Sequence, residues 1–397
     1  MVEIENGILL KYEDDGSESY AVPDGVTEIG DNAFFGARGL KKISFPASLK
    51  KIGDDAFLWS GLTELHIPAG VEEIGNGAFQ GCKELEKVTF EKGLRIIGRN
   101  AFNQCIKLKE VILPEGLKTI EAAAFRDCAM LEDAVVGEGT EKLGNGAFLD
   151  CKKLKSLVLP STLSEIEPAA ISNCVSLSTV QLDENNPYFT VSDGMLFDKY
   201  MKKLIYCPVR NESAVIPEGV EEICSFALCG CYLLKTVELP ASLKKIGGSA
   251  FRSTSGLRDI FLNDGIEFGV DPEFCDDTCI HVKSRLGEMT FFPRETPMNE
   301  CFILVLDRDY GISFDHKIKY SLIFRMYFAG IDGAAEYVKK NFAKMFGSLI
   351  DNSDADTVRK VLDMKEMVTK RNVKRLIEKS EYCKPIHDML VAYAEEL

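Results

Sequence analysis

The eleven residues EEIGNGAFQGC at positions 72–82 recur, with few changes, as EKLGNGAFLDC at positions 141–151. Intermediate copies of the same motif divide the distance between them into steps of 23 residues, and further copies lie on both sides, with one step, from Phe57 to Phe79, shortened to 22. The residue that closes the Ala-Phe pair of each copy forms one column: Phe34, Phe57, Phe79, Phe102, Phe125, Phe148, Ile171, Leu228, Phe251 and, more loosely, Phe274. A fixed period in this range predicts an architecture of stacked repeats.

One repeat is illustrated by residues 108–128, LKEVILPEGLKTIEAAAFRDC. The alternation of Val111 and Leu113 predicts a short strand with one buried face, and Pro114 with Gly116 predicts the turn that ends it. The Ala-Phe segment predicts a short helical or irregular turn. A single repeat holds too few apolar side chains to offset the entropy of ordering its backbone, so we expect stability only from stacking.

Charged residues at equivalent positions alternate in sign between neighbouring repeats, as Glu221 and Lys244 do. Opposite charges on adjacent strands stabilise a sheet modestly, so the alternation supports the 23-residue register. We interpret these columns as a solvated face with ion pairs and assign them no recognition role.

The consensus L-x-x-I-x-L-P-x-x-V-x-x-I-G-x-x-A-F-x-G-C resembles the BspA-type leucine-rich repeat over residues 20–282. The resemblance implies a right-handed leucine-rich-repeat superhelix with short parallel β-strands, which we place at residues 23–285. Residues 1–22 resemble the hairpin unit of that family and are expected to cap the first repeat. The single long step of the period resembles the family's hairpin insertion, at about residues 183–214. The function that the resemblance implies is binding of another macromolecule, usually a protein.

The periodicity changes after residue 285. Residues 316–346 have apolar side chains at helical spacing, and shorter helical patterns follow them to the C-terminus. We therefore expect a small all-α C-terminal region at residues 286–397, loosely similar to ankyrin-like helix pairs. Two interpretations of this region remain open, a second docking module and a terminal cap of the solenoid.

The charge distribution argues against nucleic acid as a partner. Residues 1–285 carry 30 basic and 44 acidic side chains, whereas phosphate binding requires a basic stripe. No apolar run reaches the about 18 residues of a membrane-spanning helix, so no membrane partner is expected. The first residues show no export signal, and we expect the thirteen cysteines to be free thiols in a cytoplasmic protein. A surface or secreted location is the alternative if a signal has been removed.

The search for chemistry gives no catalytic, cofactor or metal residues. Six cysteines occupy one column of the repeat and are interpreted as small buried side chains: Cys82, Cys105, Cys128, Cys151, Cys174 and Cys231. The segments CSFALCGC at 224–231 and CDDTCIH at 275–281 lack the paired C-x-x-C spacing typical of zinc sites. No nucleophile, metalloprotease or phosphate-loop motif is present, so we expect a protein that is not an enzyme.

The strongest functional indication is the residue of each strand that points outward between two buried positions. In three consecutive repeats this residue is apolar: Ile112, Val135 and Val158. An outward apolar stripe in an otherwise polar column is typical of a binding surface. The alternatives are that branched residues simply favour strands, or that the C-terminal region covers them. His66 and Thr89 continue the same column.

Trp59 lies in the one shortened step. We interpret it as filling the space left by the missing residue; the alternative is an exposed aromatic anchor for a partner. The sequence as a whole predicts a non-enzymatic protein-protein interaction scaffold that uses the solenoid surface. The alternatives are a cell-surface adhesin that binds host or neighbouring-cell macromolecules, and a thiol-based metal or redox protein.

Overall fold

The computed structural model describes residues 2–208, 212–263, 266–269, 271–275, 277–284, 287–291, 316–328, 330–331 and 333–397. Residues 209–211 of the expected hairpin insertion and residues 292–315 of the expected helical region lie outside this described part. The chain divides into two compact units, one formed by Met1–Arg258 with Phe268–Cys275 and the other by Asp259–Glu267 with Asp276–Leu397.

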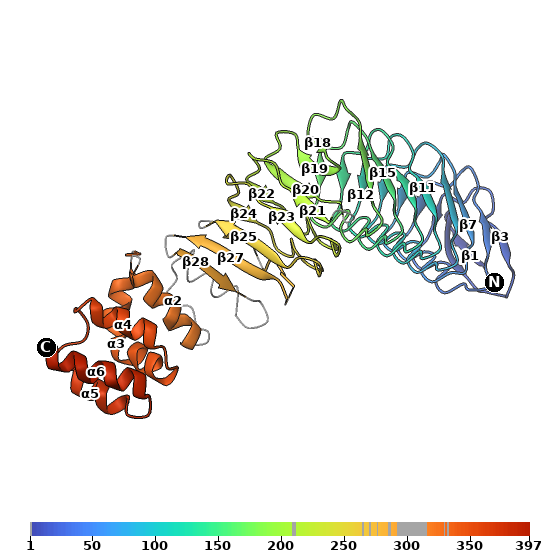
Figure 1. The fold of residues 1–397 in the computed structure, drawn as a ribbon. Coiled ribbons are helices and arrows are strands. Elements are labelled where there is room, and N and C mark those ends of the chain that lie inside the picture. The colour runs from blue at the N-terminus through green and yellow to red at the C-terminus, as the bar shows by residue number, and fades with distance from the viewer. Residues whose placement is uncertain are drawn as a thin grey trace. The chain divides into compact units, whose positions relative to one another are not determined.

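The first unit is a β-solenoid whose turns contribute strands to two sets of parallel sheets (Figure 1). One set begins with a nine-stranded sheet of mostly two-residue strands. In sheet order these are β1 (Val2–Glu5), β2 (Ile8–Tyr12), β4 (Glu28–Ile29), β6 (Lys51–Ile52), β8 (Glu73–Ile74), β10 (Ile96–Ile97), β12 (Thr119–Ile120), β14 (Lys142–Leu143) and β16 (Glu165–Ile166). β1 pairs antiparallel with β2 and ends this sheet at the N-terminus.

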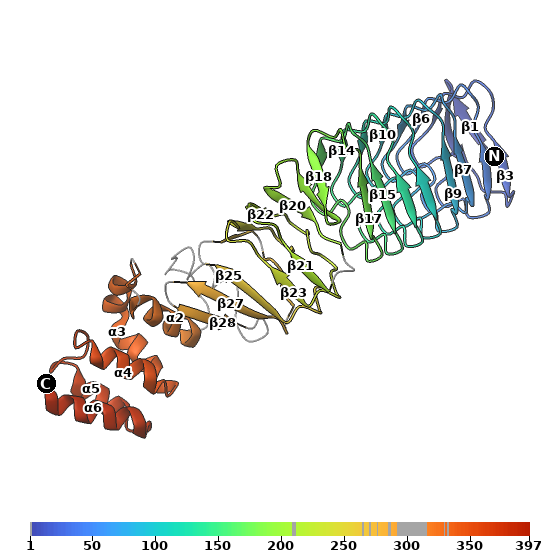
Figure 2. The same cartoon turned by 45° about the horizontal axis from the view of Figure 1, so that its top comes forward.

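The second set holds the longer strands predicted from the Val-x-Leu alternation, which lie side by side in Figure 2. Its strands are β3 (Ser19–Ala21), β5 (Lys42–Ser44), β7 (Glu64–Ile67), β9 (Lys87–Phe90), β11 (Glu110–Ile112), β13 (Asp133–Val135), β15 (Ser156–Leu159), β17 (Thr179–Leu182), β21 (Ser213–Val215) and β23 (Thr236–Glu238). These strands form separate sheets, and within each sheet neighbouring strands pair parallel in the register of the repeat, so that Glu110 lies opposite Asp133.

The long step of the period forms an antiparallel insertion. β18 (Phe189–Ser192), β19 (Met195–Asp198) and β20 (Lys203–Tyr206) follow one another in a meander, and β20 then pairs parallel with β22 (Glu222–Ile223). The same six-stranded sheet continues with β24 (Lys245–Ile246) and β26 (Glu267–Phe268). The insertion thus restarts the parallel array after the interrupted repeat.

The Ala-Phe segments are irregular turns that also hydrogen-bond from one repeat to the next. The Phe79 amide donates to the Ala101 carbonyl at 2.7 Å, and the Phe102 amide donates to Ala124 at 2.7 Å. The residue before each Ala-Phe pair has a left-handed backbone, with φ of 61° at Gly77. A continuous helix cannot contain such a residue at every turn, which explains why a turn forms here.

The core of the first unit is a column of phenylalanine rings. Phe34, Phe57, Phe79, Phe102, Phe125 and Phe148 are all fully buried. Consecutive rings stack with centroids 4.6 to 5.3 Å apart and planes 2° to 13° from parallel. The repeat period therefore places the same side chain above its own copy at every turn.

The second unit contains three strands and five described helices. The strands are β25 (Asp259–Asn263), β27 (Cys279–Ser284) and β28 (Gly287–Phe291); the helices are α2 (His316–Phe328), α3 (Ala334–Asp351), α4 (Ala355–Asp363), α5 (Val373–Lys379) and α6 (Lys384–Glu396). None of these helices is long and apolar enough to cross a membrane.

The helical C-terminal region expected from the sequence is present, and the structure adds two details. The region expected to be all α-helical includes the strand β28, which pairs antiparallel with β27. The helical pattern at 316–346 belongs to two helices, because the backbone is left-handed at Gly330 and Gly333, with φ of 69° and 83°. Apolar spacing alone did not reveal this break, since glycine is tolerated inside helical patterns.

Candidate functional site

The outward column of the longer strands is apolar in the middle of the solenoid. Ile112 lies directly opposite Val135, Val135 opposite Val158, and Val158 opposite Gln181 in the parallel register of β11, β13, β15 and β17. Ile112 is 56% exposed, and both valines are half-buried. Strands about 4.8 Å apart bring the three apolar side chains into a continuous row about 10 Å long, here called the apolar stripe.

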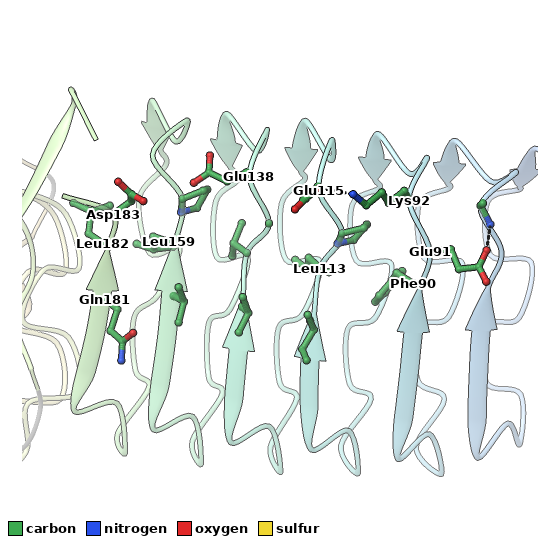
Figure 3. Close-up of a pocket in the computed structure, with 18 residues that line it drawn as sticks. Phe90, Glu91, Lys92, Leu113, Glu115, Glu138, Leu159, Gln181, Leu182 and Asp183 are labelled. Atoms are coloured by element: carbon green, nitrogen blue, oxygen red, sulfur yellow. Dashed lines mark hydrogen bonds and ion pairs between the residues drawn. The ribbon is translucent and has the colours of Figure 1, made fainter. Parts of the chain in front are cut away.

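The apolar stripe forms one side of a groove with a volume of about 940 Å³ (Figure 3). The residues one position further along each strand, Leu113, Val136 and Leu159, are buried and form the apolar base of the groove. Pro114 and Pro160 follow them and end the strands. Because each wall is built from equivalent positions of neighbouring repeats, the groove runs across the strands.

Carboxylates line the groove at the proline position of the repeat and at the position after it. Glu91, Glu115, Glu138 and Asp183 all contribute to the lining, together with Lys92, and Figure 3 shows them along the same edge. We call these four carboxylates and Lys92 the acidic rim. With four acidic side chains and one basic side chain, the rim carries a net negative charge at neutral pH.

Hydrogen bonds across repeats hold the carboxylates of the acidic rim in position. Glu91 Oε2 accepts from the Ala69 amide at 3.0 Å, and Glu138 accepts from the amide and the hydroxyl of Ser161 at 2.9 and 3.0 Å. The Lys92 ammonium lies 2.7 Å from Glu115 Oε2 and lowers the pKa of that carboxyl group. These contacts hold negative charge next to the apolar stripe.

His66 and Thr89 continue the outward column but have different surroundings. Their side chains meet at 3.0 Å between Nδ1 and Oγ1, and His66 Nε2 lies 3.4 Å from Glu91 Oε1. Both residues line a separate, more polar recess of about 430 Å³ that also includes Lys42 and Glu64. Thr89 also lines a third recess, of about 660 Å³, together with Ile112, so this polar part of the outward column adjoins the apolar stripe.

Trp59 does not fill the space left by the missing residue, and that interpretation was wrong. Its side chain is 47% exposed and contacts the exposed ring of Phe35, with centroids 5.5 Å apart. A Cβ atom on Gly81 would lie only 2.3 Å from the indole, so the glycine leaves room for the ring on the surface. Trp59 lies in a turn and not on the strand face, which explains why it does not line either groove.

The cysteine column is structural. Cys82, Cys105, Cys128, Cys151 and Cys174 are fully buried and free, and each thiol donates to the carbonyl of the phenylalanine one repeat earlier. Burial raises the pKa of Cys82 to about 12. Thiols that stay protonated are poor nucleophiles and poor metal ligands. The geometry therefore gives no support to redox chemistry in this column.

Parallel strands in a 23-residue register, a turn with a left-handed residue before each Ala-Phe pair and a buried phenylalanine column define a leucine-rich-repeat solenoid protein. The family model described as "BspA type Leucine rich repeat region (6 copies)" matches residues 12–132, 72–193 and 201–281. The chain belongs to the BspA-type leucine-rich repeat family.

A solved structure shows the same fold, and a second is reported for its similarity. A leucine-rich repeat protein from Eubacterium ventriosum is 17% identical, with a TM-score of 0.51, over 69% of this chain and 70% of that one. A leucine-rich cell surface protein from Faecalibacterium prausnitzii is 21% identical, with a TM-score of 0.46, over 70% of this chain and 86% of that one. None of the curated proteins that were compared matches the sequence.

Proposed function

We propose that the chain is a non-enzymatic scaffold that binds a segment of a partner protein in the groove over β11, β13 and β15. The observation that carries this proposal is the contiguous apolar stripe of Ile112, Val135 and Val158 next to the acidic rim. Exposed apolar rows bordered by polar groups are typical of protein-binding sites. Membership in a leucine-rich-repeat family supports the same class of function.

The chemistry of the groove indicates what a partner segment would contain. The apolar stripe and its buried base match aliphatic or aromatic side chains, whose burial supplies most of the binding free energy. The acidic rim matches lysine or arginine side chains, which also increase the association rate. We therefore expect a partner segment in which apolar and basic residues alternate.

The test is selection of binding peptides from a random peptide library against the full chain, followed by calorimetric measurement of dissociation constants. The test variant is Ile112→Lys with Val135→Lys, which places two charges in the apolar stripe. Ile96 and Ile106 are also exposed but lie outside the groove, so Ile96→Lys with Ile106→Lys is a control matched in residue type and charge.

We expect selected peptides to bind the wild type and the control alike and to bind the groove variant at least about tenfold more weakly, since loss of an interface anchor costs about 2 kcal/mol. Circular dichroism of both variants must match the wild type. Equal binding to the groove variant and the control would contradict the proposal.

A further inference from the structure

A second feature of the molecule lies in the three-stranded sheet of β25, β27 and β28. β25 and β27 run parallel, with Asp259 opposite Cys279 and Phe261 opposite His281. Residues two apart on a strand point to the same side of a sheet. Asp259, Cys279 and His281 therefore project from one face of the sheet.

The polar ends of these three side chains converge. His281 Nε2 lies 2.9 Å from Asp259 Oδ1, and one ligand atom from each residue lies within 4.8 Å of the others. In a tetrahedral zinc site with bonds of about 2.0 to 2.3 Å, neighbouring ligand atoms are about 3.3 to 3.8 Å apart. The observed distances, from 2.9 Å to at most 4.8 Å, bracket this spacing.

We propose that Asp259, Cys279 and His281 bind one Zn²⁺ ion. Thiolate, imidazole and carboxylate are the three ligand types that zinc uses in proteins, whereas calcium and magnesium require mainly oxygen ligands. Three protein ligands leave the fourth tetrahedral position for water or for a donor atom from a bound molecule. The exposed side of Asp259 faces solvent, which gives an ion access.

The surroundings of His281 favour this role. Its imidazole stacks on the ring of Phe261, with centroids 4.5 Å apart and planes 11° from parallel. The stacking fixes the plane of the imidazole, as the groups around metal ligands generally do. The histidine side chain is only 19% exposed, so a bound ion would be partly shielded from water.

Binding of the ion by Cys279 is balanced by release of a proton. Zinc binds the thiolate form of cysteine, so the Cys279 thiol must lose its proton on binding. Binding forms a zinc–sulfur bond and releases that proton to solvent, while the ion compensates the Asp259 charge.

The experiment uses the full chain, purified with a reductant and a chelator and then titrated with Co²⁺ and Zn²⁺. Thiolate-to-cobalt charge-transfer absorption reports the metal–sulfur bond, and loss of that absorption on adding Zn²⁺ gives the zinc affinity. The variants Cys279→Ser, His281→Gln and Asp259→Asn each remove one ligand. Matched controls are Cys275→Ser, a half-buried cysteine of the preceding segment, and His66→Gln, which removes another histidine beside a carboxylate.

We expect one ion per chain, no charge-transfer absorption in Cys279→Ser, and zinc affinity at least about tenfold weaker in each ligand variant, which is the least that loss of a supporting group costs a metal site. Both controls should bind like the wild type. Charge-transfer absorption that survives in Cys279→Ser, or that disappears in Cys275→Ser, would overturn the assignment.

A readout on the wild type avoids any effect of substitution on folding. Iodoacetamide labelling followed by peptide mass mapping measures the alkylation rate of each cysteine with and without Zn²⁺. Coordination should slow alkylation of Cys279 and leave Cys275 unchanged. Equal rates at Cys279 in both conditions would also refute the proposal.

Discussion

The ring of Phe102 lies on the ring of Phe125 with centroids 5.2 Å apart and planes 2° from parallel, although 23 residues separate them in the sequence. The same relationship continues on both sides, to Phe79 and to Phe148. Each phenylalanine is therefore covered by the copies before and after it. Stability in such an array depends on contacts between repeats rather than within them.

Replacing Phe102 with alanine should remove contacts to two neighbouring repeats at once. Phe→Ala in a well-packed core costs about 3–5 kcal/mol, so we expect a loss of that size in the free energy of unfolding, measured by urea denaturation. Phe35 is 51% exposed, and Phe35→Ala is the control, expected to stay within about 1 kcal/mol of the wild type. Similar losses in both variants would show that the column does not dominate the core.

Binding in the groove should depend on salt. The acidic rim adds screened electrostatic attraction to a basic partner segment, and the Debye length falls from about 10 Å at 0.1 M salt to about 3 Å at 1 M. Selected peptides should therefore bind several-fold more weakly at 1 M salt, mainly through a slower association rate. In Glu138→Gln the salt dependence should decrease. Salt-independent association would mean that the rim does not contact the partner.

Acid should destabilise the solenoid through its ion pairs. Lys244 and Lys202, at 2.6 and 2.9 Å, lower the pKa of Glu221 to about 2, below its ordinary value of 4.5. A carboxyl group with a depressed folded-state pKa stabilises the fold above its unfolded pKa, and this contribution is lost as pH falls through the folded one. Unfolding free energy should therefore decrease between about pH 4.5 and pH 2.

The measurement is urea denaturation over this pH range in the wild type and in Lys202→Gln with Lys244→Gln. The double variant should show a shallower pH dependence, because protonation of Glu221 then breaks no ion pair. Lys83→Gln with Lys152→Gln, two exposed lysines outside these pairs, is the charge-matched control. If the control variant reduces the pH dependence of the unfolding free energy equally, the effect comes from net charge alone.

The cysteine column should be unreactive while the chain is folded. With a chelator present, Ellman's reagent should leave Cys105, Cys128 and Cys151 unmodified in the native protein and should modify them in urea, because burial keeps these thiols protonated and inaccessible. Cys275 is half-buried and serves as the accessible reference. Rapid native modification of the column would restore the interpretation as a thiol-based redox protein.

The cytoplasmic location expected from the sequence stays a prediction. Fractionation of source cells with detection of the chain by antibody should find it with cytoplasmic markers and protected from labelling by membrane-impermeant reagents on intact cells. Labelling on intact cells would favour the alternative of a surface adhesin and would direct the search for partners to other cells.

Much of the groove could be predicted from the sequence because position in the repeat determines orientation. Once the 23-residue step was identified, Ile112, Val135 and Val158 had to be neighbours with the same outward direction, and the pairing of β11, β13 and β15 has this register. The acidic rim was missed although its residues also recur at 23-residue steps, as Glu115 and Glu138 do. Carboxylates in turns resemble ordinary solvated residues until their side chains are seen beside an apolar row.

The orientation of the Trp59 side chain could not be predicted from the repeat pattern. The missing residue suggested a gap to fill, but the sequence does not specify whether the backbone closes that gap by itself. The left-handed backbone at Trp59, with φ of 60°, is shared with the equivalent position Gly81, and it directs the indole outward onto Phe35. Orientation in an irregular turn depends on dihedral angles that the residue pattern does not determine.

The sequence by itself determined the class of fold, the buried columns and the outward row, because a constant period forces equivalent residues into equivalent places. Only the tertiary structure decided that Asp259 lies beside Cys279 and His281. β25 does not pair with β27 in the 23-residue register of the repeats. Asp259 lies opposite Cys279 and not opposite the residue 23 positions later in the sequence. Where the 23-residue period ends, the register of the strands depends on the packing and hydrogen bonding of the whole sheet. The spacing of residues in the sequence does not determine that register.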